Sequence, residues 1–316
     1  MYFPYLFGQS SELLALRNAN LSYLSSGLIV PIIEPIRSDP SRLLKCLEIL
    51  GQANRKVIVI LNPSQGDFYS GVPESWSSAI GGLLSQFSSI IPALICQEGV
   101  KHSYAKSFID YFDGREVAII YRNSNFSNDE MRDLAISNNV KFHIVIQNTV
   151  STFQVNFFPT LKIVHIHDRF KKKLRNADYY GMEYFTDDYK NFYGRFAGFG
   201  DYTVVGSELQ NGGGPPGAVA IHITFRNLKT NDLWIQHFVS DEVDRDVGSP
   251  ASKFLEAVGK LIVEYQNRSV EFGMNPALMD YFNDFSISHF PGLAKNKERQ
   301  ICHHIARVHD ILAGLG

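Results

Sequence analysis

Short, continuous apolar runs, each followed by a segment with helical spacing, constrain the fold of this chain more than any other feature. Residues 57–61 read VIVIL, while Leu43, Leu44, Leu47 and Leu50 recur at the spacing of a helix. Unbroken apolar runs are typical of parallel strands buried on both faces, and alternation with helices indicates right-handed βαβ units. The strands are expected at residues 2–7, 28–36, 56–61, 91–96, 117–121, 142–146 and 161–167.

An eighth strand is expected at residues 202–205 or 218–225. Eight βα units predict a (β/α)8 barrel of the TIM type, and an open doubly wound parallel sheet is the alternative. Residues 1–316 are interpreted as a single barrel-like domain. Its part from 170 to 316 carries insertions, a hairpin at 218–225 and 233–239, and long helices at 252–266 and 295–312.

Composition excludes several classes of protein. The 316 residues carry a net charge of −2, so no global field favours nucleic acid or an acidic membrane. Three widely spaced cysteines cannot make a disulfide framework or a zinc knuckle. Apolar runs stay far below the roughly 20 residues that span a bilayer, and no basic leader precedes the first one. We therefore expect a soluble, cytoplasmic protein without a membrane partner.

Polar side chains stand where the apolar runs end. In a parallel barrel these ends share one rim, which is where sites are built. We predict a rim site with Glu34, His167 and Asp168 as catalytic residues. Its expected ligand-binding residues are Asn62, Gln97, Arg122, Gln147, Arg175, Asp178, Asp201 and Tyr202. The alternative for each residue is that polar groups simply end strands.

Two histidines make the sharpest local cluster. His165 and His167 are two positions apart and so share one face of a strand. They could hold a divalent metal together with Asp168 or Asp201, or His167 could act as an acid or base oriented by Asp168. A purely structural role is the third reading. The cofactor is unknown, and a divalent metal is one option.

A basic strip follows the seventh expected strand. Five of the ten residues from 169 to 178 are cationic, and Arg175 is the candidate clamp for an anion or a nucleic-acid backbone. Tyr179 and its aromatic neighbours would stack on bases, whereas the alternative is a solvated loop. Asp201, placed just before an expected strand, would start on the wrong rim. His222 and Thr224 could face the barrel interior, with a buried, hydrogen-bonded histidine as the favoured interpretation of His222. His303, His304 and His309 are expected on the surface.

The opening residues Met1 to Leu6, the segment from Glu12 to Leu16, and Ile32-Ile33-Glu34-Pro35-Ile36 resemble the Beta protein family of bacteria and phages. The stretches HIHDRFKKKLRNADYY, GFGDYTVVGSE, PPGAVAIHITF and LWIQHFVSD resemble a bacterial branch near that family. The resemblance implies a barrel-like fold and a setting in mobile elements or phage defence. It implies no reaction and no catalytic residue.

The sequence is compatible with three functions. The first is an enzyme that binds a phosphate-bearing ligand such as a nucleotide through Arg122 and Arg175. Glu34 or Asp168 would be its base and His167 its acid, with hydrolysis or phosphoryl-group chemistry as the reaction class. The second is a module that senses a ligand or binds a protein partner without turnover. The third binds nucleic acid through residues 169–175.

Overall fold

The computed structural model describes residues 1–19, 22–192, 194–209 and 217–314. These residues form two compact units. The first, here called the barrel unit, combines Met1–Asp168 with Asp188–Tyr202. The second, here called the sheet unit, combines Arg169–Asp187 with Thr203–Gly316.

The barrel unit is built on eight parallel strands that follow one another in chain order around the sheet. Tyr2 makes parallel bridges to Ile29 on one side and to Phe199 on the other, which join the first strand to the last. The predicted α/β barrel is therefore confirmed over the open sheet. The strands are β1 (Tyr5–Leu6), β2 (Ile32–Ile33), β3 (Val57–Ile60), β4 (Ile90–Cys96), β5 (Val117–Tyr121), β6 (Val140–Ile146), β7 (Ile163–His167) and β9 (Gly198–Asp201).

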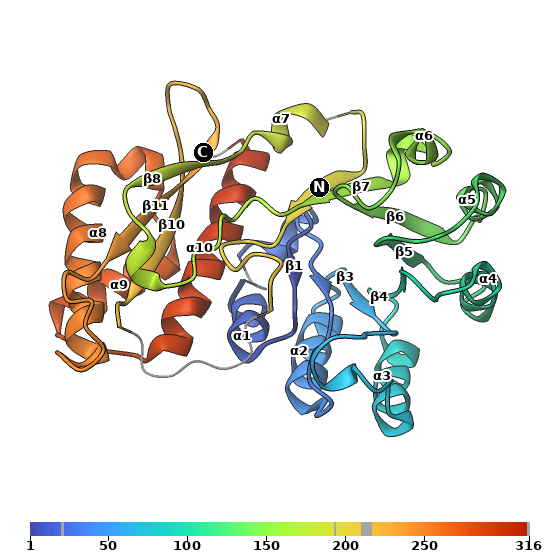
Figure 1. Cartoon of the computed structure of the whole chain (residues 1–316), viewed down its shortest axis with the longest axis horizontal. Helices are drawn as coiled ribbons and strands as arrows, with labels where there is room; N and C mark the ends of the chain where they lie inside the picture. Colours follow the sequence, from blue (N-terminus) through green and yellow to red (C-terminus); the bar gives the residue numbers. More distant parts are fainter. Residues whose placement is uncertain (20–21, 193, 210–216, 315–316) are drawn as a thin grey trace. The chain divides into compact units, whose positions relative to one another are not determined.

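Helices connect these strands and cover the outside of the barrel (Figure 1). The helix α5 begins with a capping box, in which Ser127 and Glu130 satisfy each other's backbone N–H groups. The helices α1 to α4 begin with weaker signals but bury apolar residues at helical spacing. The helices are α1 (Ser10–Ala19), α2 (Ser41–Gln52), α3 (Glu74–Gln86), α4 (His102–Tyr111), α5 (Asn128–Ala135), α6 (Thr152–Val155) and α7 (Asp188–Phe192).

The last barrel strand is β9, so the expectation of the eighth barrel strand at 202–205 or 218–225 was wrong. Its sequence, GFGD, lacks an apolar run because backbone atoms crowd it. A Cβ on Gly200 would lie 2.0 Å from the Phe3 carbonyl oxygen, and one on Gly198 would lie 2.2 Å from that of Met1. Only glycine fits these positions, and the close approach is what lets β9 pair beside the first strand.

The sheet unit contains an antiparallel sheet in the order β10 (Ala220–Arg226), β11 (Leu233–Val239) and β8 (Met182–Thr186). The predicted hairpin is confirmed, since β10 pairs with β11 throughout. Helices α8 (Pro250–Phe272), α9 (Pro276–Ser286) and α10 (Leu293–Leu312) belong to the same unit. Its core packs Ile221, Ile223 and Phe225 against Phe254 and Leu261.

Several histidine positions correct the sequence interpretation. His222 and Thr224 lie on β10, so they do not face the barrel interior. His303 and His304 are fully buried and His309 is nearly so, although all three were expected on the surface. The reason is that His303 bonds Asn275 and the Thr224 carbonyl oxygen, which satisfies its ring inside the core.

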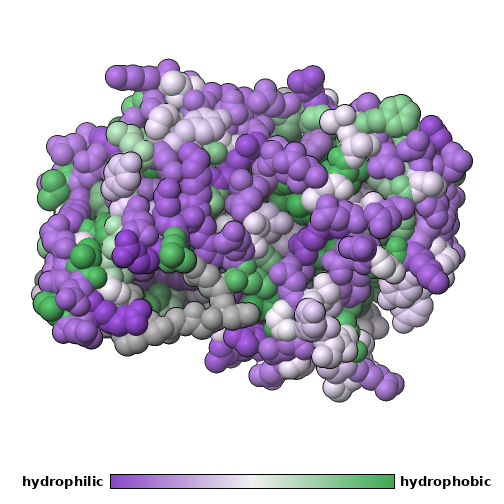
Figure 2. Space-filling view, in the orientation of Figure 1, coloured by the Kyte–Doolittle hydropathy of each residue, from purple (hydrophilic) through white to green (hydrophobic). Residues whose placement is uncertain are grey.

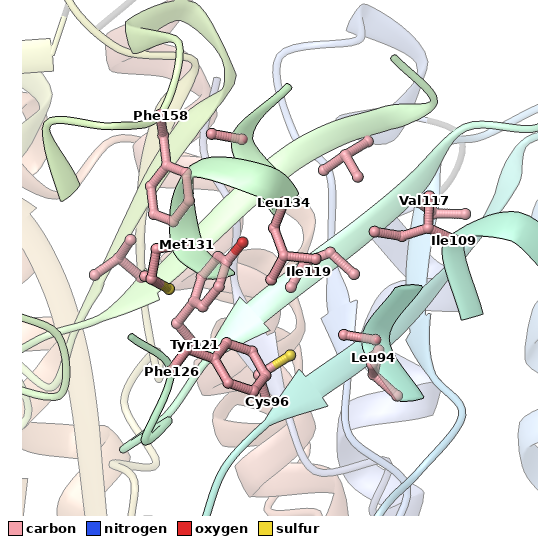
Figure 3. Packing of buried hydrophobic residues seen from close by; sticks show 14 of the residues in the cluster. Leu94, Cys96, Ile109, Val117, Ile119, Tyr121, Phe126, Met131, Leu134 and Phe158 are labelled. Carbon is pink, nitrogen blue, oxygen red and sulfur yellow. The ribbon is translucent and has the colours of Figure 1, made fainter. Parts of the chain in front are cut away.

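The core between the barrel and its helices fixes which way each strand side chain points. Cys96, Ile119 and Tyr121 pack against Met131 and Leu134 of the covering helix α5 (Figure 3). Because side chains alternate along a strand, the residues next to these must point into the barrel. This alternation decides which of the rim residues can meet.

One face of the molecule has the mixed surface that is ordinary for a globular protein (Figure 2). Hydrophilic residues predominate on the face drawn in Figure 2, with scattered hydrophobic ones among them. Within the described ranges, no helix has the length and apolarity that crossing a membrane requires.

Candidate functional site

A hydrogen-bonded network of Tyr5, Glu34 and Arg122 occupies the carboxyl end of the barrel strands. The Arg122 guanidinium donates from Nη1 to Glu34 Oε1 at 3.0 Å and from Nη2 to Glu34 Oε2 at 2.7 Å. It also donates to the Tyr5 hydroxyl at 2.6 Å, and that hydroxyl donates to Glu34 Oε2 at 2.6 Å. We call these three residues, together with Tyr202, the mouth network. The two predicted residues Glu34 and Arg122, 88 positions apart in sequence, are thus in direct contact.

Strand register brings these side chains to the same place. Tyr5 on β1 pairs with Ile32 on β2, so Glu34 lies two residues beyond its partner and on the same face. Tyr121 ends β5 pointing toward the helices, and so Arg122 points into the barrel. Its backbone N–H continues the ladder by bonding the Cys96 carbonyl oxygen at 2.9 Å. Tyr5 therefore stands within β1, and Glu34 and Arg122 stand just beyond β2 and β5.

Aromatic rings and one amide complete the mouth network. Tyr202, directly after β9, packs on Tyr5 with ring centroids 4.8 Å apart and stacks on Phe7 at 5.9 Å. The Gln65 amide donates to Glu34 Oε1 at 3.0 Å. Tyr202 was predicted, whereas Tyr5 and Gln65 were not. Tyr5 looked like a strand residue, and only the register shows that its hydroxyl meets a carboxylate.

The mouth network is buried, with Arg122 as its most accessible member. The Glu34 side chain is 0% exposed and that of Arg122 is 17% exposed. Burial would lower the pKa of the guanidinium, but Tyr5 and Glu34 outweigh it and raise this pKa. Burial raises the pKa of Tyr5 and, with Glu34 adding to it against Arg122, brings that of Tyr202 to about 12. Both tyrosines therefore remain protonated donors beside a permanent cation.

Other predicted rim residues lie near the mouth in different roles. Gln97 donates to the Ser64 hydroxyl at 2.9 Å. The Asn62 amide bonds both the N–H and the carbonyl oxygen of Ile95, at 2.8 and 2.9 Å, which holds two strands together. Asp168 is exposed, and its charge acts on the Tyr202 hydroxyl. Asp168 is therefore the predicted carboxylate that stands beside the mouth network without being enclosed in it.

The histidines of β7 point the other way. Ile163 packs in the core beneath the helices, so His165 and His167 share its outward face. His165 contacts the Phe196 ring edge-on at 4.7 Å. His167 Nδ1 bonds Asp188 Oδ2 of α7 at 2.8 Å. The sequence did not single out Asp188, because its aromatic and acidic surroundings show no period.

Two further candidates also lie away from the mouth network. Asp201 ends β9 and pairs with His167, so it stands at the predicted rim after all. The Tyr2 hydroxyl donates a hydrogen bond to Asp201 Oδ1 at 2.7 Å on the outward face. Gln147 is exposed just beyond β6. Strand ends thus share a rim, but the alternation of side chains divides that rim into an inward and an outward set.

The expected metal ligands do not assemble into a cluster. His165 and His167 have ring centroids 6.2 Å apart. Across the residues that the structure covers, no three His, Cys, Asp or Glu side chains come together as a metal would need. The two histidines alone are too few for the four-ligand sites that zinc prefers.

The basic strip belongs to the sheet unit, and most of its cations have local acceptors. Arg175 and Asp178 form an exposed ion pair at 2.6 Å. Lys172 donates to the Glu208 carbonyl oxygen at 2.5 Å, and Lys171 lies 3.6 Å from Glu183. The predicted ligand-binding residues therefore fall into two units, with Arg175 and Asp178 in the sheet unit.

Comparison with known proteins adds no relative: the chain matches no protein-family model, and no curated protein is significantly similar to it. The class of protein is defined by the fold and the site alone. The chain contains an α/β barrel of eight parallel strands with a buried Glu–Arg–Tyr network at its carboxyl mouth.

Proposed function

We propose that the barrel unit binds a small phosphate-bearing ligand, such as a nucleotide, at the carboxyl mouth of its strands. Arg122 is the anion-contacting residue, and Glu34 and Tyr5 hold its guanidinium in place. Tyr202 packs beside this group, with its ring centroid 4.8 Å from that of Tyr5. The observation that carries the proposal is the buried, hydrogen-bonded pair of Glu34 and Arg122, with Arg122 alone of the two reaching the surface.

The free-energy cost of burying an ion pair supports a functional role for Glu34 and Arg122. Burying two charges costs free energy that their attraction only partly returns, and apolar residues of similar volume are often as stable. A barrel interior needs only packed apolar side chains. Ligand binding explains why the mouth holds a fixed guanidinium instead. Nη2 already donates to both Glu34 and Tyr5, so Arg122 offers a phosphate its positive charge and its remaining N–H donors.

Hydrolysis of the bound ligand is the second candidate, and it rests on Asp168. This carboxylate is exposed and electrostatically coupled to Tyr202, so it stands beside the mouth as a candidate base. Glu34 is enclosed by three donors and acts by positioning Arg122. His167 is on the outward face with Asp188, so it is not assigned as the acid for a ligand at the mouth.

Calorimetric titration with ATP and with inorganic pyrophosphate tests the proposal. The informative variant is E34Q/R122M, because it removes both charges at once and leaves no unpaired buried ion. Loss of the charge-assisted bonds from Arg122 should weaken binding by about tenfold or more, since such bonds contribute roughly 1.5–3 kcal/mol. The exposed Arg175, changed to Gln, is the matched control and should leave binding unchanged.

Unchanged affinity in a folded E34Q/R122M variant would show that the network only fills the barrel mouth. Phosphate release from ATP is measured in the same samples. The hydrolysis candidate predicts turnover that D168N abolishes while binding persists. Binding without turnover in the wild type leaves the ligand-binding function and removes hydrolysis.

A further inference from the structure

The sheet unit contains a polar cavity. Its volume is about 210 Å³, roughly the share of seven water molecules in the liquid. Six polar or aromatic residues among those that line it are Lys172, Tyr179, His222, Asn296, Lys297 and Gln300. This cavity brings part of the basic strip together with the last helix, α10.

A relay of three side chains leads to this cavity. The His237 Nε2 atom lies 3.3 Å from Glu183 Oε1, and the Nδ1 atoms of His237 and His222 lie 2.8 Å apart. Glu183 also has the Lys171 ammonium 3.6 Å away. Both histidines are almost fully buried, at 8% exposure for His222 and 6% for His237.

The relay fixes the tautomer of each ring. An ionised carboxylate only accepts, so His237 must donate from Nε2. Its Nδ1 then carries a lone pair, and the His222 Nδ1–H donates to it. His222 is left with a lone pair on Nε2, an atom with no hydrogen-bond partner in the described part of the chain. Burial, followed by the electrostatic effects of His237 and Lys297, holds the pKa of His222 well below its usual range, so the ring is neutral.

The walls of the cavity combine this acceptor with positive charge. Lys297 is close enough to influence the His222 ring, and Lys172 is the second lysine of the lining. The Tyr179 and Phe170 rings flank His222, with centroids at 4.5 and 5.1 Å. The Gln300 amide is already committed, since its oxygen accepts the His222 backbone N–H at 3.0 Å. A cation and a neutral nitrogen acceptor are the groups left for a ligand.

We propose that this cavity is a binding site for a small oxyanion that carries its own hydrogen-bond donor, with hydrogen phosphate as the simplest case. Lys297 attracts the charge, and the His222 Nε2 lone pair accepts the O–H. Sulfate carries no proton, so its oxygens cannot donate to the Nε2 lone pair. Because two acceptors then face each other, we expect the site to reject sulfate. This site lies in the sheet unit and does not depend on the function proposed for the barrel mouth.

Nuclear magnetic resonance of the 15N-labelled histidine rings tests the proposal on the full chain at pH 6.5. The His222 Nε2 signal should be that of an unprotonated ring nitrogen. Inorganic phosphate should shift it, with an affinity at least tenfold higher than that of sulfate. A protonated Nε2, equal affinity for the two anions, or no phosphate-dependent shift at His222 would each overturn the proposal.

Two variants separate this site from the barrel mouth. K297M should lower phosphate affinity at His222 by at least tenfold, because it removes the cation at the cavity. K229M, in the hairpin turn of the same unit, is the matched control and should leave it unchanged. E34Q/R122M should also leave the His222 response unchanged, so a failure at one site does not count against the other. Loss of the response in K229M, or its survival in K297M, contradicts the assignment of Lys297.

Discussion

At the residue scale, the Glu34–Arg122 pair makes a clear stability prediction. R122M leaves a carboxylate buried at 0% exposure without its cation, and breaking such a pair costs about 3–5 kcal/mol. E34Q/R122M leaves no unpaired charge, and its amide can still bond Tyr5 and Gln65. We therefore expect the double variant to unfold within about 2 kcal/mol of the wild type in urea, as apolar replacements of buried pairs do.

The comparison of the single and double variants is decisive for this account. The same urea titration of E34Q alone isolates the effect of leaving the guanidinium unpaired. If R122M and E34Q/R122M lost equal stability, the two charges would not be energetically coupled, and the contact would have no special role.

His143 predicts how stability depends on pH. Its ring is fully buried, stacks on Phe158 with centroids 4.4 Å apart and has Nδ1 3.0 Å from the Tyr121 hydroxyl. Burial, with Lys162 as the second cause, lowers its pKa to about 3. The unfolded chain binds this proton near pH 6.5, so stability is lost as the pH falls from 6.5 toward 3. Between pH 7 and 5 the loss from this group is about 2 kcal/mol.

Chemical unfolding of the wild type and of H143F at pH 7 and 5 measures this contribution. The phenyl ring cannot titrate, so H143F should lose about 2 kcal/mol less over this interval than the wild type. Equal losses in the two proteins would mean that His143 does not enter the folded state neutral.

Residue identities at strand ends could be predicted, but their partners could not. Glu34, Arg122 and Tyr202 were recognised because polar groups directly followed apolar runs or a glycine-rich turn. The separation of His167 from Arg122 depends on which side of the sheet each faces. That in turn depends on the register of eight strands, including the shift between Val117 and Ala118. A sequence without register information cannot supply it.

At the scale of elements, the glycines of β9 predict where the barrel is sensitive. A methyl group at Gly200 would meet the Phe3 carbonyl oxygen and the Ile166 side chain. G200A should lower the free energy of unfolding by about 1–3 kcal/mol or more, as overpacking does. G81A on α3 is the matched control, because a Cβ there meets nothing within 4 Å. That change should stabilise by about 0.5–1 kcal/mol.

Thermal or urea unfolding of the two alanine variants checks the sign of each effect. A neutral G200A would contradict the close packing of β9 against the first strand. A destabilising G81A would show that the surface of α3 is more crowded than the structure indicates.

Most strands and helices could be predicted from the sequence, and the strand β9 is the exception. Runs such as the VIVI of β3 identify buried parallel strands by themselves. The strand β9 was not predicted, because its glycines, which allow the backbone of the first strand to approach closely, resemble those of a loop. The apolar run at 218–225 was then one of two candidates for the eighth barrel strand, although it pairs, as β10, with β11 in the other unit.

At the scale of the whole molecule, the two units are expected to lose structure separately. Phe254 is fully buried in the core of the sheet unit, and truncating such a ring to alanine costs about 3–5 kcal/mol. Native-state hydrogen exchange of F254A should accelerate in β10, β11 and α8 more than in β4 and β5. I119A, in the barrel core, should give the reciprocal pattern. Equal acceleration everywhere would mean that the chain unfolds as one cooperative unit.

The organisation of the chain was only partly foreseeable. The alternation of strands and helices predicted the barrel, and the change of rhythm after residue 170 indicated different structure there. The sequence did not reveal that the segments of the two units alternate along the chain. Arg169–Asp187 belongs to the sheet unit, and the following Asp188–Tyr202 belongs again to the barrel unit. No linker composition marks these crossings, and the barrel is completed only by this late segment.

The central claim is that the charged pair at the barrel mouth serves a ligand. Native mass spectrometry of an equimolar mixture of wild type and E34Q/R122M, with limiting ATP, tests it most directly because the two proteins compete in one sample. The account predicts the nucleotide adduct on the wild type, with at least tenfold less on the variant. ATP distributed equally between the two proteins, or bound to neither, would contradict it.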